Sequence, residues 1–210
     1  VAGTAVLSAA IVPLAGGVSI VSFPFDFVWF AYVWGLGRIA LVLGALDTGS
    51  AFEGMGASRE VTFATLLEPV LFLVAGALCL HAGVRSLSAA LVPQLDGPSA
   101  IVMWIAAIVA ILIVVQVEAA RMPIDDPTTH LELTMVHEVM ILDHSGPELA
   151  FLQLGSAIKL FVGISLAALL MNPLAGDGVL AALVHVGLCI AIAIAIGLSE
   201  SLVARLKLRV

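Results

Sequence analysis

Charge is what this 210-residue sequence has least of, since only 11% of its residues are Asp, Glu, Lys or Arg. Soluble domains carry about 25% charged residues, so this composition excludes an ordinary water-soluble domain. Eight Lys and Arg residues are outnumbered by fifteen Asp and Glu residues, which leaves a net charge of −7. A basic surface large enough to follow a phosphate backbone is absent, and we therefore expect no nucleic-acid partner.

Cysteine is also scarce. Cys79 and Cys189 stand far apart in apolar runs, and neither belongs to a CxxC motif. Iron–sulfur clusters are usually held by four Cys ligands, so two scattered cysteines exclude a cluster bound by this chain alone. We interpret both as buried small hydrophobic side chains. The sequence also lacks a P-loop, a Rossmann glycine motif and a GxSxG motif, so we expect no cofactor bound by this chain.

Hydrophobic residues, in contrast, make up 62% of the chain, and its mean hydropathy is +1.20. A helix needs about 20 mainly apolar residues to cross a bilayer, and six runs reach that length. No basic segment precedes the first run, so we expect no cleaved signal peptide there. The sequence predicts an all-α, polytopic transmembrane bundle in one integral membrane domain, 1–210. The six predicted spans are approximately 1–22, 27–46, 61–80, 98–117, 149–171 and 178–198.

The distribution of Lys and Arg between the loops predicts the orientation of the bundle. Loops on one side of the membrane contain a single cationic residue, Arg85. Loops on the other side contain Arg59, Arg121, Arg205, Lys207 and Arg209. Because cytoplasmic loops are enriched in Lys and Arg, we predict that the second side is cytoplasmic. Both chain ends and the long connection 118–148 then lie there.

That connection departs from the apolar pattern, because it opens with the acidic segment EAARMPIDDPTTHLELTMVHE, residues 118–138. Asp126–Pro127 is a helix-start signal, and the pattern predicts a helix over 127–142. Glu132 projects from the apolar face of that helix, where a carboxylate needs a partner or a proton. Two interpretations remain open. The helix lies on the membrane surface, or it closes a polar funnel that a partner subunit covers.

The polar face of the same predicted helix carries His130, Thr134, His137 and Glu138. A metal site is one reading of this face, but His130 and His137 are seven residues apart. Zinc sites on helices typically use ligands at positions i and i+4, and that spacing is missing. We therefore expect no metal site.

Ionisable residues also occur inside the predicted spans, where they are costly and usually face the bundle interior or a water-filled path. Glu68 precedes Pro69, which removes a helical hydrogen bond and favours a kink. One hypothesis is a proton path, and the other is a set of structural ion pairs, such as Glu68 with Arg38 or Lys159. The candidate proton-path residues are Glu68, Lys159, Glu118, Glu132 and His185.

Two segments carry a family resemblance. EAARMPIDDPTTHLELTMVHEVMILDHSGPELA, residues 118–150, resembles the signature of formate hydrogenlyase subunit 4. That family includes the membrane subunits of energy-converting [NiFe] hydrogenases and is related to the corresponding membrane subunit of NADH–quinone oxidoreductase, which is respiratory complex I. LDTGSAFEGMGASREVTFATLLEPVLF, residues 46–72, resembles the same family's other cytoplasmic loop and the helix after it. The family usually has eight helices, so this chain looks short by about two.

The resemblance implies that the acidic loop docks a peripheral arm holding nickel–iron and iron–sulfur centres. Complex I subunits usually have additional acidic residues where this chain has Pro127-Thr128-Thr129-His130. That difference favours the hydrogenase branch over quinone binding. The docking and coupling residues implied by the motifs and the predicted loop are Arg59, Glu60, Glu118, Arg121, Asp125, Asp126, Glu132, His137 and Glu138.

We therefore expect a membrane-anchor and proton-coupling subunit of a [NiFe] hydrogenase or formate hydrogenlyase complex in a prokaryotic inner membrane. Its expected partners are the hydrogenase large and small (iron–sulfur) subunits, antiporter-like membrane subunits and the lipid bilayer. The nickel–iron and iron–sulfur centres belong to the partner subunits. One alternative is a quinone-binding subunit of a complex I-type NADH dehydrogenase. An alternative of another class is an ion-coupled secondary transporter, for which paired, Gly/Pro-broken helices would be expected.

Overall fold

The computed structural model describes residues 1–13, 19–118, 136–174 and 178–202, and within these ranges it contains helices and no strand. The expected all-α bundle is thereby confirmed. The elements, in chain order, are α1 (Ala2–Ile11), α2 (Asp26–Asp47), α3 (Ala51–Ala82), α4 (Leu87–Ala90), α5 (Pro98–Glu118), the 3-10 helix η2 (Val139–Ile141), α7 (Gly146–Met171) and α8 (Val179–Leu202).

Five of the described helices, namely α2, α3, α5, α7 and α8, are long and apolar enough to cross a membrane. The chain is a multi-pass membrane protein. The expected first span, 1–22, is not continuous, because α1 ends at Ile11 and Val12 is extended at φ −76° and ψ 126°. Pro13 explains this ending, since a proline disfavours helical geometry in the residue before it. At 1.5 Å per residue, α1 is about 15 Å long and reaches half-way across a bilayer core of about 30 Å.

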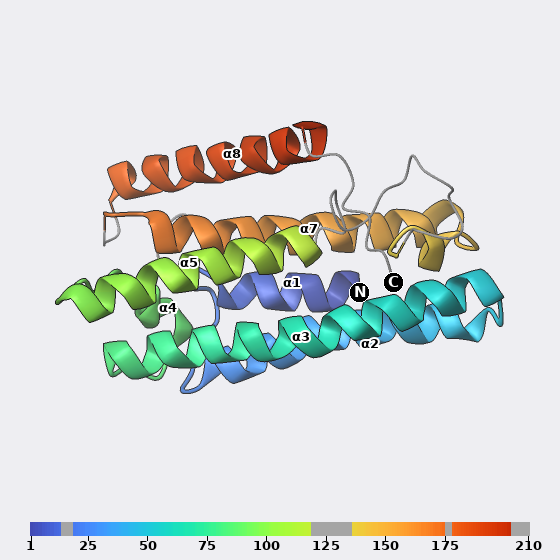
Figure 1. The fold of residues 1–210 in the computed structure, drawn as a ribbon, viewed down its shortest axis with the longest axis horizontal. Coiled ribbons are helices and arrows are strands. Elements are labelled where there is room, and N and C mark those ends of the chain that lie inside the picture. Colours follow the sequence, from blue (N-terminus) through green and yellow to red (C-terminus); the bar gives the residue numbers. More distant parts are fainter. Residues whose placement is uncertain (14–18, 119–135, 175–177, 203–210) are drawn as a thin grey trace.

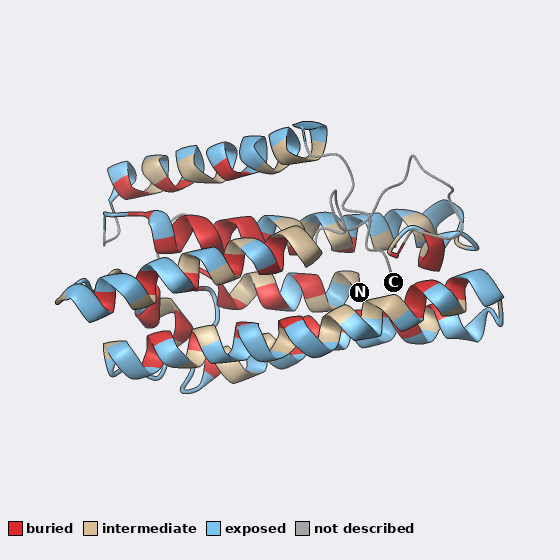
Figure 2. Cartoon of the chain, in the orientation of Figure 1, coloured by how far each residue is buried: buried red, intermediate tan, exposed pale blue. Residues whose placement is uncertain are grey.

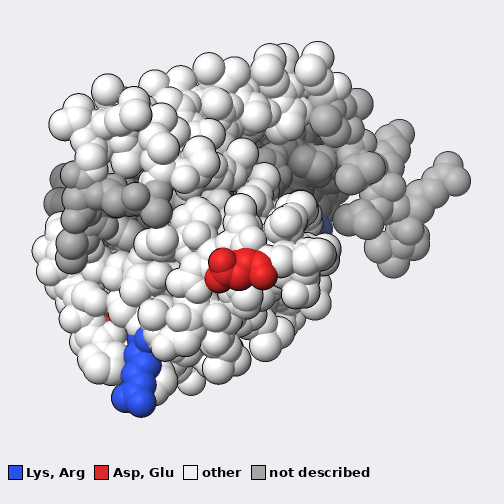
Figure 3. Space-filling model, turned by 90° about the vertical axis from the view of Figure 1, so that its left-hand side faces the viewer, with Lys and Arg blue, Asp and Glu red and all other residues white. Residues whose placement is uncertain are grey.

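The five long helices lie side by side along the long axis of the molecule (Figure 1). A short turn joins α2 to α3 at one end, which we call the hairpin end. The opposite end carries α4 and is called the α4 end. Figure 3 shows that the described part of the α4 end is mostly uncharged, with one prominent basic and one prominent acidic group on the white surface. The sequence likewise places few charged residues in the loops at this end. Which side of the membrane each end faces stays a prediction.

The main apolar core lies where α7 packs against α5 and α1, and α7 supplies buried residues from Val162 to Leu170. Figure 2 shows buried residues concentrated on the part of α7 nearest the α4 end, whereas α8 has few of them. Glycines let α1 enter this core. A Cβ on Gly155 of α7 would lie 2.9 Å from the backbone nitrogen of Ala2. Helix α1 therefore packs against α7 so closely that the two backbones are in direct contact.

A second, smaller core lies at the hairpin end, where Val139 and Met140 of η2 pack on α2 and α3. Gly56 of α3 makes this contact possible, since a Cβ there would lie 2.2 Å from Val139 Cγ1. The expected helix over 127–142 is wrong in its described part, because residues 136–138 form turns and only 139–141 are helical, in 3-10 geometry. Burial of Val139 and Met140 against α3 holds this segment in a tight turn. Residues 127–135 lie outside the described ranges.

Candidate functional site

A buried guanidinium organises the interior of the bundle. Arg38 lies twelve residues into α2 and is only 4% exposed. Its Nε is 2.9 Å from Oε1 of Glu60 on α3, and its Nη2 donates to Oε2 of Glu118 at the end of α5. Its Nη1 lies 3.9 Å from Oε1 of Glu68. An Arg fork can serve several carboxylates at once because its five donors point in fixed directions.

Glu118 connects this guanidinium to a second cation. The other oxygen of its carboxylate, Oε1, accepts a hydrogen bond from Nζ of Lys159 on α7. The Lys159 ammonium also lies 5.1 Å from the centroid of the Trp34 ring, within the range of a cation–π contact. Four long helices thus contribute to one cluster. We call Arg38, Glu60, Glu68, Glu118 and Lys159 the ion-pair network.

The composition of the ion-pair network leaves it unbalanced. Among these five residues, two cations face three carboxylates, so their formal charges sum to −1 when all are ionised. Charges inside a low-dielectric bundle interact strongly with one another. A change of charge nearby therefore acts strongly on these five side chains.

Glu68 lies at the edge of the network, and its side chain is 40% exposed. Gly35 of α2 leaves room for it, since a Cβ on residue 35 would lie 3.0 Å from Oε1 of Glu68. The outer part of the network therefore reaches the perimeter of the bundle. Helix α1 covers another side. A Cβ on Gly37 would lie 2.5 Å from Oγ1 of Thr4 and 3.9 Å from Cε of Lys159.

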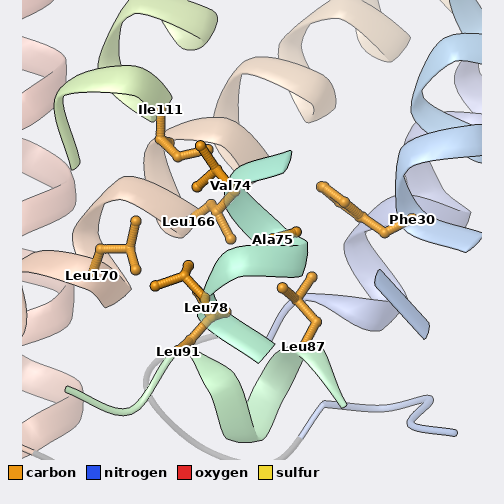
Figure 4. A pocket seen from close by; sticks show the side chains of 9 residues that line it. All are labelled: Phe30, Val74, Ala75, Leu78, Leu87, Leu91, Ile111, Leu166 and Leu170. Carbon is orange, nitrogen blue, oxygen red and sulfur yellow. The ribbon is translucent and has the colours of Figure 1, made fainter. Parts of the chain in front are cut away.

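On the α4 side of the network, side chains of α2, α3, α4, α5 and α7 form a compact apolar layer. Figure 4 shows nine apolar side chains around a small void; they are Phe30, Val74, Ala75, Leu78, Leu87, Leu91, Ile111, Leu166 and Leu170. The void has a volume of about 10 Å³. A water molecule needs about that volume together with two or more polar partners, and the lining offers none. We call these nine side chains the dry layer.

Comparison with known proteins identifies the chain's family. The family model described as NADH dehydrogenase matches residues 1–209, which is nearly the whole chain. The chain belongs to the NADH dehydrogenase family. It is also similar to two proteins of Escherichia coli (strain K12). It is 33% identical to hydrogenase-4 component C over 164 residues, covering 77% of this chain and 48% of that protein. It is 27% identical to formate hydrogenlyase subunit 4 over 191 residues, covering 87% of this chain and 61% of that protein.

These relationships confirm the resemblance expressed by the two motifs, 46–72 and 118–150. The chain spans about half to three-fifths of the length of these curated relatives.

Several expected site residues meet in the ion-pair network. The sequence assigned four of its residues to the docking loops and to the proton path. Glu60, Glu68 and Glu118 contact Arg38, and Lys159 joins them through Glu118. Arg59 precedes Glu60 in α3. The expected residues Arg121, Asp125, Asp126 and Glu132 lie outside the described residues, so their roles stay predictions.

The remaining expected residues lie elsewhere. His137 Nε2 is 3.2 Å from Oγ of Ser156 on α7, and Glu138 is exposed beside η2. His185 of α8 is 3% exposed, and its Nε2 is 3.2 Å from Oγ of Ser165. Ser165 is six residues beyond Lys159 on α7 toward the α4 end, about 9 Å along the axis. The structure therefore joins His185 to the α7–α8 contact and not to the ion-pair network.

Two buried charged residues have larger roles than the sequence indicates. The sequence presents Arg38 only as a possible ion-pair partner, yet it contacts three carboxylates. Asp26 lies between two predicted spans, yet it is fully buried at the start of α2. Its Oδ1 accepts the backbone N–H of Leu87 at 2.6 Å, and its Oδ2 accepts the hydroxyl of Ser86 at 2.9 Å. The position of Asp26 immediately before an apolar run, together with the serines of 86–88, is the sequence signal for this cap on α4.

Proposed function

We propose that this chain is a membrane-anchor and proton-coupling subunit of a membrane-bound [NiFe] hydrogenase or formate hydrogenlyase complex. The names of the two Escherichia coli relatives support the type of complex. The observation that carries the coupling role is the ion-pair network, in which two buried cations face three carboxylates. An ion-coupled secondary transporter is less well supported, because both relatives are named as parts of hydrogen-metabolising enzymes.

The residues proposed for docking lie close in sequence to Glu118, a member of the ion-pair network. Glu118 is both the last residue of α5 and the first residue of the acidic segment that contains Asp125 and Asp126. A peripheral arm bound to this segment would act on the backbone that holds Glu118. Glu118 in turn bonds both Arg38 and Lys159. A change in the arm's charge or position therefore has a direct route to the proton occupancy of the network.

Redox chemistry in this proposal belongs to partner subunits. The two described cysteines are free and lie on different helices, α3 and α8. The nickel–iron and iron–sulfur centres would lie in the large and small hydrogenase subunits, docked at the hairpin end. Antiporter-like membrane subunits would receive the proton-linked signal within the membrane.

The coupling role is tested by Glu118→Gln in the complete complex. Glutamine keeps the size of the side chain but removes the charge shared by Arg38 and Lys159. We expect the complex to assemble and the peripheral arm to retain dye-linked hydrogen oxidation, while proton uptake or release coupled to turnover in vesicles is lost. Glu148→Gln is the matched control, because Glu148 is 76% exposed and paired with His144 away from the network. Normal coupled proton movement in Glu118→Gln would contradict the coupling role.

The docking role is tested separately by Asp125→Lys combined with Asp126→Lys. Reversing charge at a protein–protein contact costs several kcal/mol through repulsion and lost pairing. We expect the large and small hydrogenase subunits to dissociate from the membrane fraction while this chain stays inserted. If both soluble subunits remain bound after detergent extraction, the acidic segment does not dock them.

A further inference from the structure

The short helix α4 owes its place to contacts with the rest of the bundle. It has only four residues, Leu87–Ala90, whereas an isolated helix shorter than about 12–15 residues is only marginally stable in water. Leu87, Ala90 and the following residue, Leu91, are all buried. Helix α4 is therefore built into the α4 end of the bundle and depends on its packing and capping there.

Three hydrogen bonds from the start of α2 hold the start of α4. The buried carboxylate of Asp26 accepts the backbone N–H of Leu87 at 2.6 Å and the hydroxyl of Ser86 at 2.9 Å. The residue before it adds a third bond, because the N–H of Phe25 donates to the carbonyl of Arg85 at 2.7 Å. Phe25 has φ 67°, a left-handed conformation that is strained for a residue with a bulky side chain. We call these three hydrogen bonds the α4 clamp.

The α4 clamp lies next to the dry layer. Leu87, whose N–H is bonded to Asp26, and Leu91 are two of the nine side chains of that layer. Phe30, another of the nine, lies one helical turn after Asp26 on α2. Figure 4 shows the two leucines below the void in that view and Ile111 above it. If α4 moved away, the dry layer would lose Leu87 and Leu91 and would open toward the α4 end.

The dry layer excludes water only while it is complete. A small void without polar partners stays dry, and a charge that crosses apolar material without water or a polar partner meets a very high cost. Loss of two leucine side chains would remove both conditions, because it would leave room for water next to the void. The barrier between the α4 end and the ion-pair network therefore depends on α4 staying in place.

We propose that α4, held by Asp26, is a plug that keeps water and protons from reaching the ion-pair network from the α4 end. Asp26 is then a positioning residue, which acts by holding α4 and not by contact with the network. The inference rests on the proposed coupling function for its purpose, since a network open to both faces of the membrane at once would let protons leak through the bundle. The plug itself is defined by access of water to the dry layer.

Thiol labelling in the complete complex tests the plug. In a background where Cys79 and Cys189 are replaced by alanine, Ala75→Cys places one thiol in the dry layer, seven residues before the end of α3 and about 10 Å from it. A charged, water-soluble methanethiosulfonate is added to both faces of the membrane, so that the result does not depend on orientation, and labelling of this chain is followed by mass spectrometry. Leu95→Cys, at an exposed position of the α4 end, shows that the reagent reaches that end.

We expect residue 75 to be labelled slowly while the α4 clamp is intact. Ser86→Ala removes one hydrogen bond to a charged carboxylate, so labelling should become about tenfold faster. Asp26→Ala removes two such bonds and should give faster labelling still. Ser86→Ala decides the question if Asp26→Ala does not assemble.

Asn172→Ala is the matched control for general loosening of the bundle. Asn172 is also buried, follows the last residue of α7, and donates to the carbonyl of Ala181 at 3.1 Å without lining the dry layer. Its replacement should leave the labelling rate of residue 75 unchanged. Equal acceleration by Asn172→Ala and Ser86→Ala would overturn the plug, as would rapid labelling with the clamp intact or unchanged labelling in both clamp variants.

Passive proton leak gives a second readout. In vesicles that contain the complex but no substrate, the leak should rise in Ser86→Ala and Asp26→Ala and stay at the parental level in Asn172→Ala. Faster labelling without a faster leak would show that another barrier stops protons, and the plug would be overturned. Both readouts are taken without turnover, so their failure leaves the Glu118→Gln test of coupling unaffected, and normal coupling in Glu118→Gln would leave the plug standing.

Discussion

Gly35 of α2 and Glu68 of α3 approach each other so closely that a methyl group on residue 35 would lie 3.0 Å from the Glu68 carboxylate. The absence of a side chain at position 35 thus determines where the carboxylate rests at the edge of the ion-pair network. Because the obstructed atoms are at the far end of a flexible side chain, a larger residue at position 35 would move Glu68 before it disturbed the helices.

Gly35→Ala should therefore alter coupling more than stability. Alanine favours a helix over glycine by about 1 kcal/mol, which offsets the local crowding, so we expect the thermal midpoint of the detergent-solubilised complex to change little. Coupled proton movement in vesicles should fall. Gly44→Ala is the control on the same helix, since a Cβ there meets nothing within 4 Å. Equal behaviour of the two variants would show that the Gly35–Glu68 contact has no functional role.

Gly56→Ala should loosen the segment that follows the acidic loop. Its Cβ would lie 2.2 Å from Val139 Cγ1 and 3.0 Å from the carbonyl of Val136, so η2 must move away from α3. Overpacking of this kind costs about 1–3 kcal/mol. We expect faster proteolysis between residues 136 and 146, measured by mass spectrometry. Gly54→Ala, where a Cβ meets nothing within 4 Å, should cleave at the parental rate.

Lys159→Met should leave the complex assembled but impair coupled turnover or proton uptake. The variant network would hold one cation against three carboxylates, although Glu118 would keep its bond to Arg38. Breaking a buried pair completely costs about 3–5 kcal/mol, so the remaining bond should limit the loss of stability to less than that. Normal coupled activity in Lys159→Met, or failure to assemble, would identify Lys159 as a structural ion-pair partner.

The orientation of the bundle is tested by a cysteine at Thr128. The excess of Lys and Arg predicts that residues 118–148 face the cytoplasm. In a background where Cys79 and Cys189 are replaced, the new thiol should resist an impermeant maleimide in intact cells and react after lysis. Labelling in intact cells would reverse the orientation and remove the basis for docking a cytoplasmic arm.

Much of the bundle could be predicted from the sequence because apolar length is a local property. The expected run 98–117 corresponds to α5, which ends one residue later at Glu118, and 149–171 corresponds to α7 with three further residues at its start. The predicted span 1–22 was wrong as a single helix. Composition shows that a segment is hydrophobic, but it does not show that the helix through it is continuous. Pro13 ends the helix although the residues around it are apolar.

The candidate site was only partly predictable, for a different reason. Burial of ionisable residues in apolar runs indicated that Arg38, Glu68 and Lys159 needed partners. Which carboxylates meet depends on the rotation and depth of each helix, which one sequence does not specify. Glu60 and Glu118 fall near the ends of predicted spans, where the sequence favours docking. They lie against Arg38 because α3 extends ten residues before its predicted span and α5 carries Glu118 on its final turn.

The dry layer has an electrical consequence. A transmembrane voltage falls mainly across material that excludes water and ions, and moving one elementary charge through 100 mV involves about 2.3 kcal/mol. Phe30, Leu166 and Leu170 place such material between the ion-pair network and the α4 end. Most of the voltage across this chain should therefore fall beyond the network. A proton that enters from the hairpin end would reach Glu118 with little electrical work, and protonation there should depend only weakly on membrane potential.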